Sequence, residues 1–471
     1  MAGFSFRQLF EKARRAIFPT AKPASHRRPV IIQIGLDFGT AFTKVVCRDV
    51  TARRAWVYVP ASPKTELPFL LPSVLFAGKA GNDWSLAHAS NALHQFELGA
   101  PKLALSEITS NIANSADITE LYRRIAADTG LHASEFIRDA VSFYLSGILG
   151  GVLRHLRESD LGFGSVPGDS VAVCMALPAQ SMAEAPLKTA FLDCLRRGYW
   201  LATLHDPPNG AVGVMELRRR LSEFVPAPGD EWRCQLYPEV SANMVAYTQS
   251  RAAEAGIFQM LDVGAGTVDI SFFIFVRNAE AVTLNNFSGI VAHCGSSFIE
   301  RKAAAALGRS SDPEMLARLR RIKEGARHGT AEEQSAIDEA LTQLREPVAT
   351  ATHCSIIEMM RMLNRQGRRQ LHDTRFVFVG GGLTDDPYRR SATQTWESLG
   401  RTNQGIAGIP PPSELEPHAQ CHAWFPRLTV AYGLSFDSNN RPGATTPGDH
   451  EPPPEGPPPP ERPNATTKDE V

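Results

Sequence analysis

The stretch Leu261–Phe273, LDVGAGTVDISFF, places two glycines and a threonine between two apolar runs. Asp262 lies near the end of the first run, and Asp269 lies near the start of the second. A short glycine-bearing segment between β-rich runs is typical of a tight hairpin turn, or of a loop whose backbone N–H groups bind phosphate. Read alone, this stretch leaves both interpretations open.

The same order of residues occurs much earlier, in Ile31–Val46, IIQIGLDFGTAFTKVV. Here too a strand-like run ends in an acid, Asp37, and a turn with Gly39 and Thr40 leads into a second run. In the phosphate-binding interpretation, the glycine lets backbone N–H groups approach a phosphate and the threonine adds a hydroxyl donor. The acid then faces the metal that the phosphate carries. The repetition favours phosphate binding over two unrelated turns.

A third glycine turn follows a β-like run in Phe376–Pro387, FVFVGGGLTDDP. Three consecutive glycines, Gly380, Gly381 and Gly382, are costly in a folded chain unless something approaches the backbone closely. The sequence contains neither a GxxxxGK[ST] loop nor a strand–GxGxxG–helix fingerprint. Any nucleotide site in this chain therefore belongs to neither of those two classes.

Composition limits the class of protein. The chain has 471 residues, 43% of them hydrophobic and 21% charged, which is ordinary for a globular protein. A formal net charge of −1 gives no electrostatic reason to expect nucleic acid as a partner. The seven cysteines are scattered and form no CxxC pair, which favours reduced thiols in a cytosol-like compartment. We therefore expect a soluble cytoplasmic protein.

Residues 30–436 alternate between strand and helix patterns, which predicts an α/β fold with mixed sheets covered by helices. The predicted strands are Val30–Leu36, Thr43–Cys47, Ser73–Phe76, Ser170–Leu177, Phe258–Asp262, Ile270–Val276 and Phe376–Val379. The predicted helices are Ala140–Glu158, Ala183–Arg197, Ser241–Ala255, Ser296–Ala306, Pro313–His328, Glu332–Asn364 and Leu428–Leu434.

Both ends of the chain differ from this central part. Residues 1–29 contain a basic amphipathic helix pattern, Gly3–Phe18, followed by prolines. Three interpretations stay open for it: a helix packed on its own domain or a partner, a helix on an anionic membrane surface, or an organelle transit peptide. Residues 437–471 include PPPEGPPPPERP (Pro452–Pro463), which predicts a disordered, partly polyproline II tail.

The three turns, in this order and approximate spacing, resemble the superfamily of actin, hexokinase and heat-shock chaperone ATPases. The resemblance is closest to the DnaK-type chaperone nucleotide-binding domain, without its C-terminal substrate-binding domain. It implies a bilobed actin-like ATPase fold, with two duplicated ribonuclease-H-like lobes and a nucleotide cleft between them. The lobes are expected at about 30–255 and 256–420, and a closing helix at about 426–436.

Other stretches resemble the chaperone branch. YPEVSANMVAYTQ (Tyr237–Gln249) is similar to a connecting segment with an acid at the position of Glu239. RLRRIKEGARH (Arg318–His328) is similar to the helix that contacts ribose and base. This match assigns Glu324 to the ribose, and Arg327 and His328 to the surroundings of the base. Val171–Gln180 and Leu428–Phe436 are similar to a core strand and to the closing helix.

The sequence also departs from the chaperone pattern. Lys44 stands where actin has a phosphate-binding lysine and chaperones have another residue. Lys102 is the nearest equivalent of the catalytic lysine of chaperones. Leu383 and Asp385 replace a serine and an adenine-stacking arginine, for which His328 is the candidate substitute.

The resemblance implies an ATP and Mg²⁺ site, and hydrolysis of ATP with water to ADP and phosphate. Mg²⁺ is expected to be held through its waters by Asp37 and Asp262, and charge to be neutralised by Lys44 and Lys102. Either Glu239 or Asp269 is expected to orient the attacking water. The expected nucleotide contacts are Gly39, Thr40, Gly264, Gly266, Thr267, Gly295, Glu324, Arg327, His328, Gly380, Gly381 and Gly382.

Four functions are compatible with such a site. The first is a chaperone-like ATPase that switches conformation with the nucleotide and acts with a protein client or partner. The second is an actin-like filament protein, or an ATPase that contacts a membrane through its N-terminal helix. The third is a pseudo-ATPase adaptor, and the fourth, ranked last, is a sugar kinase.

Overall fold

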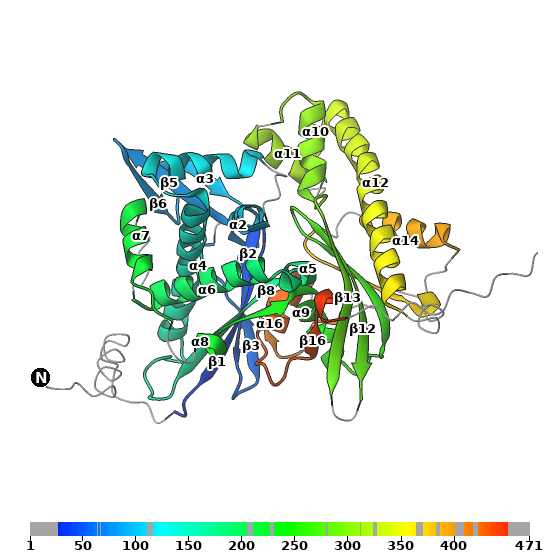
Figure 1. The fold of residues 1–471 in the computed structure, drawn as a ribbon, viewed down its shortest axis with the longest axis horizontal. Coiled ribbons are helices and arrows are strands. Elements are labelled where there is room, and N and C mark those ends of the chain that lie inside the picture. The colour runs from blue at the N-terminus through cyan, green and yellow to red at the C-terminus, as the bar shows by residue number, and fades with distance from the viewer. Residues whose placement is uncertain are drawn as a thin grey trace, which may run out of the picture.

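The computed structural model describes residues 27–63, 65, 67–110, 116–204, 211–226, 230–278, 281–310, 312–323, 327–363, 371–382, 387–400, 409–417 and 423–450. These residues form an α/β protein with mixed sheets, which confirms the predicted class (Figure 1). Except for residues 27–29, the N-terminal segment lies outside the described residues, and so does Pro452–Pro463.

The largest sheet has seven strands in the order β10-β8-β1-β2-β3-β15, with β4 paired to β2. Strand β1 lies inside this sheet, antiparallel to β2 and parallel to β8. Every residue of β1 after Ile31 is buried, as its continuous apolar pattern requires for a strand covered on both faces. The strands are β1 (Ile31–Phe38), β2 (Phe42–Asp49), β3 (Arg54–Val57), β4 (Leu71–Pro72), β8 (Ser170–Leu177), β10 (Cys234–Pro238) and β15 (Leu415–Glu416).

The second sheet has five strands in the order β14-β11-β12-β13-β16. Its strands are β11 (Gly256–Val263), β12 (Val268–Arg277), β13 (Val282–Ala292), β14 (Arg375–Val379) and β16 (Gly443–Thr445). Strand β16 pairs with Thr283–Asn285 of β13, although it belongs to the stretch predicted as a disordered tail. The side-chain amide of Asn286 donates to the carbonyl of Thr445 at 2.6 Å, so backbone pairing and a buried amide hold this segment.

The two sheets repeat one topology. In the first, β1 pairs antiparallel with β2, β2 pairs antiparallel with β3, and β8 lies parallel on the other side of β1. In the second, β11, β12 and β13 form the antiparallel part, and β14 lies parallel to β11. Strands β1 and β11 are therefore equivalent, and each ends at one of the two glycine turns.

A third, four-stranded sheet has the order β7-β5-β6-β9. The sequence predicted only Ser73–Phe76 of it, because the other strands are short or rich in polar residues. Its strands are β5 (Val74–Ala80), β6 (Asp83–Ala87), β7 (His94–Gly99) and β9 (Val212–Gly213). Helices α3 (Ala116–Thr129) and α7 (Val214–Ser222) accompany this sheet.

Helices cover the outer faces of both large sheets (Figure 1). On the seven-stranded sheet these are α2 (Pro101–Ser110), α4 (Ala133–Glu158) and α6 (Ala185–Leu204), while the short helices α5 (Ala179–Ala183) and α8 (Asp230–Arg233) follow β8 and precede β10. On the five-stranded sheet they are α10 (Ser297–Ala306), α11 (Pro313–Lys323), α12 (Ala331–Met362) and α14 (Pro387–Ser398). Of the described helices, α4 is long and apolar enough to cross a membrane, but it is mostly buried, which is consistent with a soluble protein.

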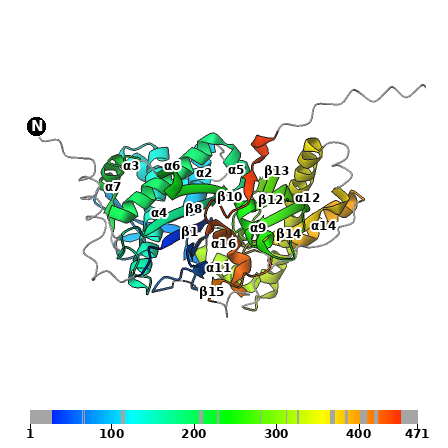
Figure 2. The same cartoon turned by 90° about the horizontal axis from the view of Figure 1, so that it is seen from below.

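Two buried helices, α9 (Glu239–Gln249) and α16 (Thr429–Leu434), lie between the two large sheets (Figure 2). Glycines let their backbones approach closely. A Cβ atom on Gly35 of β1 would lie 2.0 Å from the carbonyl oxygen of Ala431, and one on Gly433 would lie 2.0 Å from that of Ala242. The closing helix α16 therefore packs directly on both β1 and α9.

Two predicted boundaries differ in the structure, one of a lobe and one of a helix. Strand β15 falls within 256–420 but pairs with β3 of the first sheet. The described part of helix α11 spans Pro313–Lys323, and His328, the predicted end of this helix, is not helical.

Candidate active site

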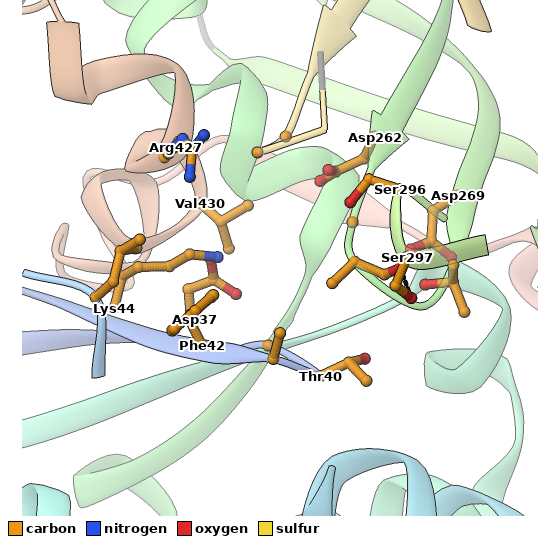
Figure 3. Close-up of a pocket in the computed structure, with 18 of the residues that line it drawn as sticks. Asp37, Thr40, Phe42, Lys44, Asp262, Asp269, Ser296, Ser297, Arg427 and Val430 are labelled. Carbon is orange, nitrogen blue, oxygen red and sulfur yellow. Dashed lines mark hydrogen bonds and ion pairs between the residues drawn. The ribbon is translucent and has the colours of Figure 1, made fainter. Parts of the chain in front are cut away.

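A cavity between the two large sheets is lined by residues from both. Strands β1 and β11 bring Asp37 and Asp262 to it from opposite sides (Figure 3). The cavity is lined by all six residues predicted to be catalytic, which are Asp37, Lys44, Lys102, Glu239, Asp262 and Asp269. The tertiary structure thus brings together side chains that are far apart in the sequence.

Each glycine turn is flanked by a cross-strand pair of polar residues. In the first sheet Asp37 is directly opposite Lys44, whose ammonium donates to the Oδ2 atom of Asp37 at 2.7 Å. In the second sheet Asp262 is directly opposite another acid, Asp269. The first pair is neutral overall, whereas the second places two carboxyl groups side by side.

The two acids of the second sheet have strongly perturbed pKa values. Burial, followed by the negative charge of Glu239, raises the pKa of Asp262 to about 7. The side-chain amide of Asn243 donates to Asp262 at 2.8 Å and opposes this shift. Burial and the charges of Glu239 and Asp262 also raise the pKa of Asp269 well above its usual value. Its buried Oδ1 atom accepts no hydrogen bond from any described residue.

Lys102 supplies a positive charge to this acidic group from helix α2. Its ammonium lies 3.4 Å from the carboxylate of Glu239, the first residue of α9. Burial alone would lower the pKa of Lys102, but the carboxylates of Glu239, Asp37 and Asp269 outweigh burial and raise it. Lys102 therefore stays protonated at neutral pH.

The two glycine turns meet at the edge of the cavity, which Thr40 and Thr267 both line. A Cβ atom on Gly266 would lie 3.2 Å from the Cγ2 atom of Thr40, so the turns are in close contact. None of Gly39, Gly264 and Gly266 has a positive φ. Glycine is required there because neighbouring atoms lie close to where a Cβ atom would be, and not because of the backbone conformation. A Cβ atom on Gly295 would lie 2.5 Å from the amide nitrogen of Thr267. Only glycine at position 295 therefore lets the chain pack this closely against the second turn.

The third glycine turn closes the site beside Asp262. Gly380 has a φ of +98°, and a Cβ atom there would lie 2.5 Å from the Oδ1 atom of Asp262. Gly381 lines the cavity, while the amide of Gly382 donates to the carbonyl of Val263 at 3.0 Å. This turn therefore needs glycine both for its backbone conformation and for the approach of the acid.

The residues expected around the ribose and base are placed differently. Arg327 and His328 are exposed, lie outside helix α11 and do not line the cavity. Glu324 lies outside the described residues, and so do Leu383 and Asp385. Helix α11 lines the cavity instead with Arg320 and Lys323. Both contact the buried carboxylate of Glu300, at 3.3 and 3.2 Å.

Several lining residues carried no recognisable sequence signal. Asn243 bridges the site to the closing helix, since it donates to Asp262 and accepts from the hydroxyl of Thr429 at 2.5 Å. Ser297 donates its backbone N–H and its hydroxyl to the carbonyl of Ala265. Arg427 enters from the short helix η2 (Phe425–Arg427) just before α16. The sequence did not reveal these roles, because the same side chains also occur in helices that line no site.

A second cavity borders the first at Thr40, Lys102 and Thr267. It is lined by apolar side chains such as Leu177 and Phe191 together with polar ones such as Glu107 and Glu184. Both threonine turns are thus reached from two cavities.

The donor set fits a hydrated divalent cation. Asp37, Asp262 and Asp269 bring acidic oxygens to one cavity, and a cation would offset the burial and the repulsion that raise the two pKa values in the second sheet. In the part of the chain that the structure describes, no group of three or more His, Cys, Asp or Glu side chains is arranged to ligate an ion directly. Mg²⁺, which keeps several of its waters, suits such a site.

Comparison of the sequence with protein-family models gives no match, and comparison with curated proteins finds no similar one.

Proposed function

We propose that this chain is an ATP-binding protein of the actin-like and chaperone-like ATPase class. One observation carries the proposal. Two sheets of the same topology each end a central strand in an aspartate and a glycine–threonine turn, and the two turns meet at the edge of one cavity. Backbone N–H groups with hydroxyls suit phosphate, and paired acids suit its metal. The repeated topology supports a bilobed fold with a nucleotide between duplicated halves.

The roles of the residues follow from their positions. The turns at Gly39–Thr40 and Gly264–Thr267 donate to phosphate oxygens, and Lys44 and Lys102 neutralise charge around the transferred phosphoryl group. Asp37 and Asp262 would hold a Mg²⁺ ion through its water molecules, and the ion would offset the negative charge of the phosphates. Glu239, or Asp269, accepts a hydrogen bond from the attacking water and orients it.

The site supports a conformational switch, because its two halves belong to different sheets. A ligand that contacts both glycine turns binds the closed arrangement better than an open one, and so shifts the population towards it. A partner protein that distinguishes the two arrangements would then respond to the nucleotide. We propose a chaperone-like switch acting with a protein client or partner.

The deciding experiment measures binding of ATP by calorimetry and its turnover, each with Mg²⁺ and with EDTA. We expect Asp37→Ala and Asp262→Ala to lose Mg²⁺-dependent binding or hydrolysis, while Asp83→Ala, an exposed acid outside the cavity, retains both. Wild-type turnover in either site variant would exclude the metal arrangement proposed above. Binding without turnover would instead identify a pseudo-ATPase adaptor.

An actin-like filament protein is the second candidate, favoured by the position of Lys44 in the cavity. Sedimentation with and without ATP tests it. ATP-dependent pelleting over a wide concentration range supports filaments, and its absence excludes them.

A further inference from the structure

The cavity is lined by five cationic side chains, and four of them already contact carboxylates. The pairs are Lys44 with Asp37 at 2.7 Å, Lys102 with Glu239 at 3.4 Å, Lys323 with Glu300 at 3.2 Å and Arg320 with Glu300 at 3.3 Å. The fifth is Arg427. Among residues whose positions the structure gives, no carboxylate lies within ion-pair distance of Arg427. It is thus the lining cation that is available to a ligand.

The backbone around Arg427 is well anchored. The ring of Phe425 is buried, and the amide of Leu428 donates to the carbonyl of Phe425 at 2.8 Å. Helix α16 begins immediately afterwards and is buried along its whole length. The backbone that carries this guanidinium is therefore already ordered, so binding through Arg427 does not require ordering of the backbone at this point.

The guanidinium lies beside the third glycine turn. A methyl group on Gly381 would lie 3.8 Å from the Nη1 atom of Arg427 and 3.9 Å from its Cζ atom, which is ordinary van der Waals contact. Figure 3 shows Arg427 and Lys44 on one side of the cavity, with Asp262, Ser296 and Ser297 on the other. Arg427 therefore faces the space that lies between the two aspartate-bearing strands.

We propose that Arg427 binds the phosphate chain of the nucleotide. This inference rests on the proposed nucleotide site and names a contact that the superfamily resemblance does not supply. The resemblance assigned Arg327 and His328 to the nucleotide, but both lie outside the cavity. A bound polyphosphate brings several negative charges next to five lining carboxylates, and the forked guanidinium donates two parallel hydrogen bonds to phosphate oxygens.

The test compares Arg427→Ala, Arg427→Lys and Arg327→Ala with wild type. The matched control is Arg389→Ala, which removes an exposed arginine of α14 that does not line the cavity. Dissociation constants are measured for Mg·ATP, Mg·ADP and Mg·tripolyphosphate, the last by displacement of a fluorescent ADP analogue. Urea midpoints of all variants verify folding.

We expect Arg427→Ala to weaken all three ligands about 10- to 100-fold, the range for a hydrogen bond to a charged group. Arg427→Lys should recover only part of this affinity, because lysine keeps the charge but cannot donate two parallel hydrogen bonds, and Arg327→Ala should bind like the control. Wild-type ATP affinity in Arg427→Ala overturns the proposal. So does a loss confined to ATP and ADP with unchanged tripolyphosphate affinity, which would place the guanidinium on the nucleoside.

The same measurements give a different result if the proposed nucleotide site itself is wrong. If wild-type protein binds none of the three ligands, both the proposed function and this contact are wrong. If wild type binds and Arg427→Ala binds equally well, only the assignment of Arg427 is wrong.

Discussion

Lys44 donates to Asp37 at 2.7 Å from the position directly opposite it in the hairpin of β1 and β2. In the equivalent hairpin of β11 and β12, that position is occupied by an acid, Asp269, opposite Asp262. The charges of the β1–β2 hairpin therefore neutralise each other, whereas the two acids of the β11–β12 hairpin repel each other when both are ionised. This asymmetry determines how the site should respond to pH, to a cation and to substitution.

The stability of the ligand-free protein should depend on pH through Asp262. Its pKa of about 7 in the folded state lies above the ordinary value of 3.8, so the folded state retains a proton that the unfolded state has lost. The contribution of Asp262 to stability should therefore be fully present below its ordinary pKa and be lost as pH rises from about 4 through 7. Asp269 adds to the slope, since its pKa is also raised.

Urea unfolding in EDTA across this pH range measures the effect. Asp262→Asn should flatten the profile without abolishing its slope, and Asp83→Asn should leave it unchanged. A difference in stability between wild type and Asp262→Asn that stays constant between about pH 4 and pH 7 would contradict the raised pKa. Binding of Mg·ATP below pH 7 should release protons, which calorimetry in buffers of different ionisation enthalpy detects.

Removing Lys44 should affect stability as well as binding. The carboxylate of Asp37 is almost completely buried, with its side chain 6% exposed, and Lys44→Met would leave it without its cation. We expect a loss of about 3 kcal/mol in the free energy of unfolding, because an unpaired buried charge is costly. Asp37→Asn in the same background should recover part of it. Equal stabilities of the single and double variants would show that the pair is not coupled.

Position 266 should be more sensitive than position 265. A Cβ atom on Gly266 would lie 3.2 Å from Thr40, so Gly266→Val forces the two turns apart and should lower ATP affinity about tenfold or more. Ala265 contributes its carbonyl, which accepts from the backbone N–H and hydroxyl of Ser297, and glycine retains that carbonyl. Ala265→Gly should bind ATP almost as wild type does. The reverse order of affinities would contradict the contact between the turns.

Asn243 should couple the closing helix to the metal-binding acid. Asn243→Ala removes the donor to Asp262 and leaves the buried hydroxyl of Thr429 without its acceptor. We expect a loss of about 1 to 3 kcal/mol in stability and a further rise in the pKa of Asp262. Thr429→Val, which removes only the second contact, should leave that pKa unchanged. Chemical denaturation as a function of pH measures both effects.

Local sequence patterns predicted much of the sheet structure. Strand β8 spans Ser170–Leu177 as predicted, and β1 and β11 match their predicted runs within two residues at each end. Such strands can be predicted from the sequence, because a short continuous apolar run bounded by glycine fits few other secondary structures. Strand β13 carries polar residues such as Asn285 and Asn286, and β16 is three residues long, so pairing with neighbouring strands rather than composition defines them.

The sequence by itself determined the two aspartate–glycine–threonine turns and the glycine-rich third turn, because turn chemistry depends on a few adjacent residues. Only the tertiary structure decided which charges meet. It paired Lys44 with Asp37 but left Asp269 opposite Asp262, and it placed Arg327 and His328 outside the cavity. It also brought Asn243 and Arg427 to the site from α9 and η2. These outcomes depend on burial and on contacts between distant segments, which residue spacing does not encode.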